Sequence, residues 1–272
     1  MALHPHERDE ISNTLLDIAR EAAAVVVEGW RTTPDVEHKG RIDLVTRYDR
    51  ASEELLRARF EARLPGFDVV AEEGGGTASS ERPVLYADPL DGTTNFAHGH
   101  PFFCVSLALV ERDVVLAAAV VAPALQAEYR ASFGGGAWRN GARCHVSASA
   151  RLVDALLATG FGYDVHTRED NNLREFSALT RRCRGVRRCG SAALDLCHVA
   201  DGTYDGYWEA GLKPWDLSAG ALMVLEAGGV LSDLDGASFD PRRGDVVASN
   251  GRLHGTLLKA LHETRAQPFV TV

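Results

Sequence analysis

The stretch Val84-Leu-Tyr-Ala-Asp-Pro-Leu-Asp-Gly-Thr-Thr-Asn-Phe96 carries the strongest structural signal in this chain. Its apolar start predicts a short buried strand over residues 84–87. We expect Asp88-Pro89 to end that strand, because proline cannot donate to a sheet ladder. Gly92, two hydroxyls and an amide then predict a helix start with free backbone N–H groups. Carboxylates that can hold hard cations, Asp88 and Asp91, thus lie beside N–H groups that can hold an anion.

The plainer interpretation of this stretch is a surface turn, since Asp, Pro, Gly, Thr and Asn are all ordinary turn residues. That interpretation suits any one of these residues alone. The whole ordered string, with apolar residues on both sides, instead favours a functional site.

The bulk composition predicts a globular protein with a substantial core. The chain has 272 residues, of which 45% are hydrophobic and 25% charged. That length allows one large domain or two packed halves. Its net charge of −9 argues against a broad nucleic-acid footprint, so a nucleic-acid partner is not expected. An anionic substrate remains compatible, because bound divalent cations invert the local field.

Cysteines and apolar runs predict the compartment. The five cysteines form no C-x-x-C pair, which favours reduced thiols over a zinc site or a disulfide scaffold. The first residues contain no apolar signal core, and the longest apolar run, residues 114–122, is too short to span a bilayer. We therefore expect a cytoplasmic protein without a membrane partner.

The first half of the chain, residues 1–147, is predicted to be an α+β subdomain. Apolar spacing of three and four predicts an amphipathic helix over residues 9–30, ended by Thr33-Pro34. Asp49 is expected to cap a second helix, and Gly74–Gly76 to form a mobile loop. The remaining segments are a helix over residues 51–64 and strands over residues 42–46, 67–71, 102–110, 114–121 and 127–133.

The second half, residues 148–272, is predicted to be an α/β subdomain that shares a cleft with the first. Its apolar segments alternate between strand and helix lengths. We expect strands over 155–159, 185–188, 205–208, 229–232 and 246–248, and helices over 171–183, 192–200, 215–227 and 253–263.

Further carboxylates lie at predicted element ends rather than on surfaces. Glu72 ends a strand, Asp49 begins a helix, and Asp216 lies in the first turn of the helix that Pro214 opens. Each of them has a simpler explanation as a cap, a dipole partner or a solvated charge. Together with Asp88 and Asp91 they would bring too much negative charge into one cleft without cations. An all-oxygen donor set of this kind favours Mg²⁺.

On these motifs the chain resembles the inositol monophosphatase family of Mg²⁺-dependent, lithium-sensitive phosphatases. Matching strings occur in the family's order over nearly the full length: Asp43-Leu-Val-Thr-Arg-Tyr-Asp49, Ala71-Glu-Glu73, residues 88–96 with His98-Gly99 and Pro101, Gly190-Ser-Ala-Ala193, Tyr207-Trp-Glu-Ala-Gly211 and Trp215-Asp216.

The resemblance implies a role for each matching residue. Glu72, Asp88 and the Leu90 carbonyl would hold one Mg²⁺, and Asp88, Asp91 and Asp216 a second. A third, weaker ion is expected near Glu72, which makes two to three ions per site. Thr93 with Asp49 or Glu72 would orient and deprotonate the attacking water. Gly92, Thr93 and Thr94 would contact the phosphate. Lys39 matches a lysine of the family's mobile loop only loosely, because the spacing is shifted by one.

The resemblance also implies a fold, an assembly and a chemistry. The fold would be a layered α-β-α-β-α sandwich, and members commonly form homodimers. Two metals roughly 4 Å apart can activate water, clamp the phosphoryl oxygens and stabilise the leaving alkoxide. Hydrolysis would then need no covalent phosphoenzyme.

The substrate is expected to be a small phosphorylated polyol, with inositol monophosphate favoured. Glu209 matches a carboxylate that contacts the inositol ring, and Gly190, Ser191 and Ala192 match the neighbouring wall. A carboxylate there would repel a second phosphate, which disfavours fructose 1,6-bisphosphate and 3′,5′-bisphosphonucleotides. Histidinol phosphate remains open. So does a different class of function, an interaction protein in RNA synthesis with residual activity.

Overall fold

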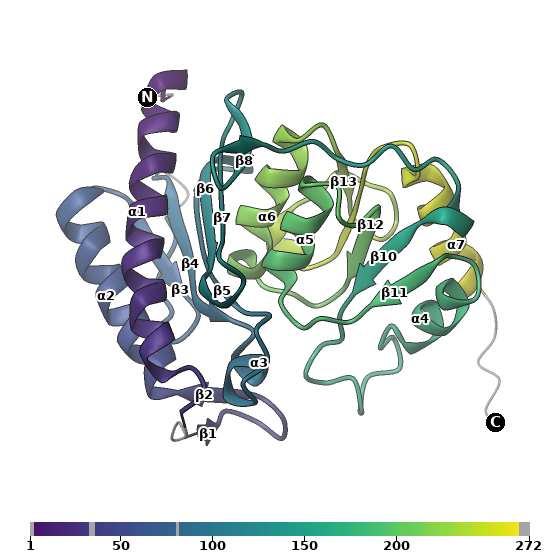
Figure 1. The fold of residues 1–272 in the computed structure, drawn as a ribbon, viewed down its shortest axis with the longest axis horizontal. Coiled ribbons are helices and arrows are strands. Elements are labelled where there is room, and N and C mark those ends of the chain that lie inside the picture. Colours follow the sequence, from purple (N-terminus) through teal and green to yellow (C-terminus); the bar gives the residue numbers. More distant parts are fainter. Residues whose placement is uncertain (1–2, 33–35, 80–81, 267–272) are drawn as a thin grey trace.

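The computed structural model describes residues 3–32, 36–79 and 82–266, and it shows a five-layered sandwich (Figure 1). Two helices, α1 (Pro5–Gly29) and α2 (Arg47–Arg63), cover one face of a seven-stranded sheet. Helices α5 (Ala192–Ala200) and α6 (Pro214–Glu226) fill the space between this sheet and a five-stranded one. Helices α4 (Leu173–Thr180) and α7 (His254–Arg265) cover the far side. The predicted α-β-α-β-α sandwich is therefore confirmed.

The larger sheet is mostly antiparallel, as expected for the first half of the chain. Its strands lie in sequence order, and only β3 and β4 pair in parallel. They are β3 (Asp68–Ala71), β4 (Val84–Asp91), β5 (Cys104–Glu111), β6 (Val114–Ala122), β7 (Ala127–Ser132), β8 (Gly136–Arg139) and β9 (Ala142–Arg143).

The smaller sheet is mixed and has the order β11-β10-β12-β14-β13. Strand β10 pairs in parallel with both of its neighbours, whereas β14 runs antiparallel to β12 and β13. Its strands are β10 (Leu156–Thr159), β11 (Gly185–Arg187), β12 (Gly206–Glu209), β13 (Val230–Ser232) and β14 (Val246–Ser249). The remaining short elements are a β1 (Val36–His38)–β2 (Leu44–Thr46) hairpin, helix α3 (Thr93–Ala97) and three single 3₁₀ turns.

Helix α6 is buried on every side, because it lies between the two sheets. Every residue from Leu217 to Val224 is buried, which explains why this segment lacks a polar face. Gly220 lets α5 approach closely, since a Cβ there would lie 2.4 Å from the Leu196 Cβ. The tight α5–α6 pair brings the first turns of both helices to the larger sheet.

Strand β4 corrects the prediction that Asp88-Pro89 ends the strand. It continues through Pro89 to Asp91, with an irregularity in its pairing to β5 between Asp88 and Asp91. A bulge is one of the few places where a sheet accepts proline, because the missing N–H is not needed in the ladder.

The predicted start of the second helix is also wrong. Helix α2 begins at Arg47, four residues early, with Thr46 as its N-cap and Asp49 in its first turn. Thr46 and Asp49 form a capping box. The Thr46 side chain accepts from the backbone of Asp49, and the Asp49 carboxylate accepts from the backbone N–H of Thr46. The Thr-x-x-Asp spacing already carried this signal.

The glycine tract after Glu73 is anchored, contrary to the prediction of a mobile loop. Glu53 of α2 accepts hydrogen bonds from the backbone N–H groups of Glu73 and Gly74. Arg57 donates to the Gly75 carbonyl at 2.7 Å.

Other predicted elements exist with ends shifted by a few residues. Helix α4 covers only the middle of its predicted range, and the Thr33-Pro34 stop lies outside the described residues. The boundary between residues 147 and 148 stays a prediction. Over the described parts of the chain, no helix has the length and apolarity needed to cross a membrane.

Asn172 makes a testable contribution to this fold. Its Nδ2 donates to Thr159 Oγ1 at 2.7 Å and to the Gly160 carbonyl at 2.8 Å, and its Oδ1 accepts from Trp208 Nε1. Asn172→Ala leaves buried polar groups unsatisfied, so we expect the free energy of unfolding to fall by about 2–3 kcal/mol. Urea denaturation measures this, with the exposed neighbour Leu173→Ala as control. Equal midpoints for the two variants would contradict the assignment.

Candidate active site

The bulge in β4 turns two carboxylates to the same face of the larger sheet. Asp88 pairs with Ser106 and Asp91 with Cys104, so three steps along β4 match two along β5. Strand side chains alternate between faces, and residues three apart would normally point to opposite sides. The extra residue cancels that alternation. Both carboxylates therefore face the layer of α5 and α6.

The N-terminus of α5 holds Asp91. Its Oδ2 accepts hydrogen bonds from Ser191 Oγ at 2.6 Å and from the Ala193 N–H at 2.9 Å, and the Ala192 N–H also contributes. Free N–H groups at a helix start favour a negative charge. Burial raises the pKa of Asp91 to about 6, and these hydrogen bonds oppose the rise.

Thr93 links this strand end to helix α2. Its Oγ1 lies 2.8 Å from Asp49 Oδ1 and 3.0 Å from the Leu90 carbonyl, and its single proton can serve only one acceptor at a time. Asp49 Oδ2 accepts from both the N–H and the hydroxyl of Thr46. Burial raises the pKa of Asp49. A buried hydroxyl thus touches a buried base.

Gly92 joins the strand to helix α3 in a conformation that only glycine adopts easily. Its φ is +95°, and a Cβ there would lie 2.9 Å from the Phe102 carbonyl. Thr94 is exposed on the following turn. Close packing around Gly92 keeps the turn after Asp91 tight.

Asn95 ties this turn to the second half of the chain, a role that the sequence analysis missed. Its Nδ2 donates to the carbonyls of Phe102 and Cys189, both at 2.7 Å, and lies 3.4 Å from that of Gly190. The segment that leads into α5 is thereby held against the β4–α3 turn. Its only signal in the sequence was its place in the motif.

Glu72 lies at the end of β3 and pairs with a lysine that was left outside the predicted core set. Lys39 Nζ lies 2.9 Å from Glu72 Oε1 and 2.5 Å from Glu73 Oε1. Burial raises the pKa of Glu73 to about 7. Lys39 therefore neutralises part of the charge at this edge of the cluster.

Asp216 lies in the first turn of α6, as predicted. Its Oδ2 accepts a hydrogen bond from the Lys213 N–H at 2.7 Å, and the side chain is partly buried. Burial and the charge of Asp91 raise the pKa of Asp216. Burial and the charges of Glu72, Asp91 and Asp216 likewise raise the pKa of Asp88. The four carboxylates therefore act on one another as a single cluster.

This cluster has the chemistry of a site for hard cations. Its donors are all oxygen, and they repel one another in a buried place, a strain that a divalent cation would relieve. Within the described residues, no three His, Cys, Asp or Glu side chains are arranged as a ligand group. Several of the oxygens instead accept hydrogen bonds from nearby N–H groups, as Asp88 does from Leu90 and Asp216 from Lys213.

Glu209 ends β12 and is 7% exposed. Tyr207 donates a short hydrogen bond to its carboxylate, and Gly160 lies directly against it. Burial raises the pKa of Glu209 to about 7, while Arg188 lowers it and Asp91 raises it. Glu209 is therefore within the electrostatic range of the cluster. The predicted wall residues Ser191 and Ala192 are turned to Asp91, and Gly190 lies beside Asn95 and Arg188.

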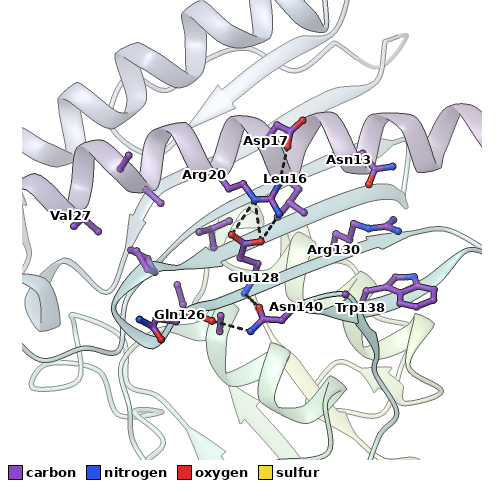
Figure 2. Close-up of a pocket in the computed structure, with 17 residues that line it drawn as sticks. Asn13, Leu16, Asp17, Arg20, Val27, Gln126, Glu128, Arg130, Trp138 and Asn140 are labelled. Atoms are coloured by element: carbon purple, nitrogen blue, oxygen red, sulfur yellow. Dashed lines mark hydrogen bonds and ion pairs between the residues drawn. The ribbon is translucent and has the colours of Figure 1, made fainter.

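A separate groove of about 1,090 Å³ lies between α1 and the strands β6–β8 (Figure 2). Figure 2 shows Arg20 of α1 reaching Glu128 of β7, which in turn contacts Asn140. The lining includes Leu16, Val27 and Trp138, and the predicted site residues lie elsewhere.

Fold and site together define a class: a two-sheet α/β sandwich with a buried carboxylate cluster at a bulged strand end. Residues 7–266 match the family model described as "Inositol monophosphatase family". The chain belongs to that family.

Individual relatives agree over nearly the whole length. The chain is 43% identical over 257 residues to an inositol-1-monophosphatase of Synechocystis, a match that covers 92% of this chain and 90% of that protein. It is 40% identical over 256 residues to the Nus factor SuhB of Pseudomonas aeruginosa, with 92% and 94% covered. The structure of an inositol monophosphatase from Anabaena (Nostoc) superposes with a TM-score of 0.86 at 37% identity, covering 94% of this chain and 96% of that one.

Glu209 makes the stability of the protein depend on pH. Its pKa of about 7 in the folded protein lies above the ordinary glutamate pKa of 4.5, so the folded state holds the proton more tightly. The contribution of the Glu209 proton to the free energy of unfolding is therefore complete below pH 4.5, and it is lost as the pH rises through 7. We expect Glu209→Gln to exceed wild type in free energy of unfolding by about 2–3 kcal/mol at pH 8, and to match it near pH 4.5.

Urea denaturation at several pH values measures this difference. The exposed Glu61 of α2, changed to Gln, serves as the control for a pH-independent effect. A Glu209→Gln difference that stays constant from pH 4.5 to 8 would refute the assignment.

Proposed function

We propose that this protein is a Mg²⁺-dependent phosphomonoesterase that hydrolyses inositol monophosphate to inositol and phosphate. The observation that supports it most is the 2.8 Å contact between Thr93 Oγ1 and Asp49 Oδ1, beside the carboxylates of the β4 bulge. A hydroxyl that touches a buried base next to a candidate metal cluster is suited to activating water.

The proton path in this proposal uses residues that are already in contact. Thr93 accepts a proton from the attacking water while its own proton passes to Asp49. Burial raises the pKa of Asp49, which makes this carboxylate a better acceptor at neutral pH. The Thr46 hydroxyl and N–H fix the other Asp49 oxygen and so keep its partner oxygen directed at Thr93. Glu72 is the alternative acceptor.

The proposed ligands are those of the carboxylate cluster. Glu72, Asp88 and the Leu90 carbonyl would hold one Mg²⁺, Asp88, Asp91 and Asp216 a second, and Glu72 a weaker third. When bound, Mg²⁺ would lower the pKa of a water ligand and stabilise the departing oxygen. The like-charged, buried carboxylates support this assignment, because a cation would offset their repulsion.

The substrate residues of the proposal lie on both sides of the cluster. The N–H groups of Gly92, Thr93 and Thr94 would contact the phosphate. Glu209 would accept hydrogen bonds from hydroxyls of the polyol, with the segment Gly190–Ala192 beside it. The charge of Asp91 raises the pKa of Glu209, and Asn95 Nδ2 lies 3.4 Å from the Gly190 carbonyl. Both observations support a common pocket.

The same proposal includes a cytoplasmic homodimer that lithium inhibits. Its support is the family membership and the near-complete length of the matches. Because the Pseudomonas relative is named a Nus factor, an accessory role in RNA synthesis is the second candidate.

Phosphate release from a panel of esters separates these candidates. The panel contains inositol 1-phosphate, fructose 1,6-bisphosphate, histidinol phosphate and adenosine 3′,5′-bisphosphate, each with Mg²⁺ and with excess EDTA. We expect Mg²⁺-dependent release that is fastest for inositol 1-phosphate. No release from any ester with Mg²⁺ present would reject the phosphatase and favour the interaction role.

Asp91→Asn tests the ligand assignment. The amide keeps the size of the side chain, and its oxygen can still accept from Ser191 and Ala193, so we expect a folded protein. Loss of the charge should abolish phosphate release. The exposed Asp113→Asn is the matched control and should retain full activity. Near-normal release by a folded Asp91→Asn variant, judged by circular dichroism and the melting temperature, would reject Asp91 as a ligand.

A further inference from the structure

Ser191 connects helix α5 to the carboxylate cluster through a single hydroxyl. It is the N-cap of α5, where its Oγ accepts from the Leu194 N–H at 3.4 Å. The same Oγ donates to Asp91 Oδ2 at 2.6 Å. Ser191 is only 1% exposed, so its side chain has almost no surface that a substrate could reach. The chemical role of this hydroxyl therefore lies with Asp91.

The groups around Asp91 gather at one of its two carboxylate oxygens. Ser191 Oγ and the Ala193 N–H both donate to Oδ2, and Cys104 Sγ of β5 lies 3.9 Å from the same atom. Cys104 Sγ is also 3.6 Å from Ser191 Oγ. Because the two oxygens of a carboxylate lie on opposite sides of its carbon, holding Oδ2 beside Ser191 turns Oδ1 away from α5. Contacts at Oδ2 thus set the direction of Oδ1.

The chain just before Ser191 is fixed by the other half of the molecule. Asn95 Nδ2 donates to the Cys189 carbonyl at 2.7 Å and lies 3.4 Å from the Gly190 carbonyl. Asn95 itself belongs to the turn that follows Asp91 in sequence. The same turn therefore holds the segment that carries the hydroxyl close to the carboxylate that accepts from it.

We propose that Ser191 is a positioning residue, whose hydroxyl fixes Asp91 through Oδ2 and so presents Oδ1 to Mg²⁺. This inference rests on the proposed function, in which Asp91 is a metal ligand. A hydroxyl suits the task, because it holds the carboxylate without cancelling the charge that attracts the cation. Loss of a partner that orients a metal ligand typically lowers metal affinity by about 10–100-fold. The effect should appear in the affinity for Mg²⁺ and leave the binding of the ester unchanged.

Two substitutions separate this role from that of a helix cap. Both Ser191→Ala and Ser191→Gly remove the hydroxyl, but glycine is a much better N-cap than alanine. We expect both variants to bind Mg²⁺ about tenfold more weakly at one site, since both lose the donor to Asp91. Only Ser191→Ala should show a clearly lower melting temperature. Ser191→Thr keeps both the hydroxyl and the cap, and its affinity for Mg²⁺ should stay close to that of wild type.

Calorimetric titration of Mg²⁺ into the substrate-free protein measures this affinity, with Thr264→Ala as the control. Thr264 is a buried residue of α7 whose Oγ1 donates to the Ala260 carbonyl at 2.8 Å. Its loss removes a buried hydroxyl on the far side of the smaller sheet and should leave Mg²⁺ binding unchanged. Steady-state kinetics at saturating Mg²⁺ give a second readout, the KM for inositol 1-phosphate, which should match wild type in every variant.

Weaker Mg²⁺ binding in both Ser191→Ala and Ser191→Gly, with an unchanged KM, supports the inference. Wild-type affinity in Ser191→Gly would overturn it and leave Ser191 as a helix cap alone. A raised KM at saturating Mg²⁺ would overturn it in favour of a substrate contact, and a Ser191→Thr variant as weak as Ser191→Ala would also contradict it. If wild type binds no Mg²⁺, the proposed function itself fails.

Discussion

The bulge at Pro89-Leu90 is the constraint on which the candidate site depends. Without the extra residue, Asp88 and Asp91 would point to opposite faces of the larger sheet. With it, both face the layer of α5 and α6. The same bulge directs the Leu90 carbonyl to Thr93, and the Pro89 carbonyl accepts from Ser52 of α2 at 3.0 Å. One irregularity in a ladder thus sets the direction of four polar groups.

The carboxylates are held in place by neutral donors rather than by opposite charges. Ser191 and two N–H groups of α5 hold Asp91, Leu90 holds Asp88, and Lys213 holds Asp216 through its backbone. Hydrogen bonds of this kind keep the oxygens in fixed positions while leaving the negative charge largely uncompensated. Lys39, which pairs with Glu72 and Glu73, balances only one edge of the cluster. Carboxylate oxygens held in this way are the ligands that hard divalent cations take.

The two sheets contribute different parts of the site, and Asn95 joins them. The larger sheet supplies the bulge, helix α3 supplies Thr93, and helix α2 supplies Asp49. The smaller sheet supplies Glu209, at the end of β12. Asn95 donates a hydrogen bond from the β4–α3 turn to the Cys189 carbonyl. This contact holds the proposed reaction centre beside the proposed substrate wall. The α5–α6 pair between the sheets adds rigidity, since its core is buried on every side.

Local sequence by itself determined the periodic helices, the alternation of strands and helices after residue 147, and the chemistry of Asp88–Phe96. These features follow from nearest-neighbour patterning and from motif resemblance, which need no knowledge of long-range contacts. The prediction that the strand ends at Pro89 was wrong, because a bulge depends on the partner strand β5. Lys39 was matched only loosely, and the role of Asn95 was missed. Lys39 pairs with Glu72, 33 residues away, and Asn95 donates to the Cys189 carbonyl, 94 residues away. Only the tertiary structure could decide these contacts, because the packing of the two sheets around α5 and α6 brings distant segments together.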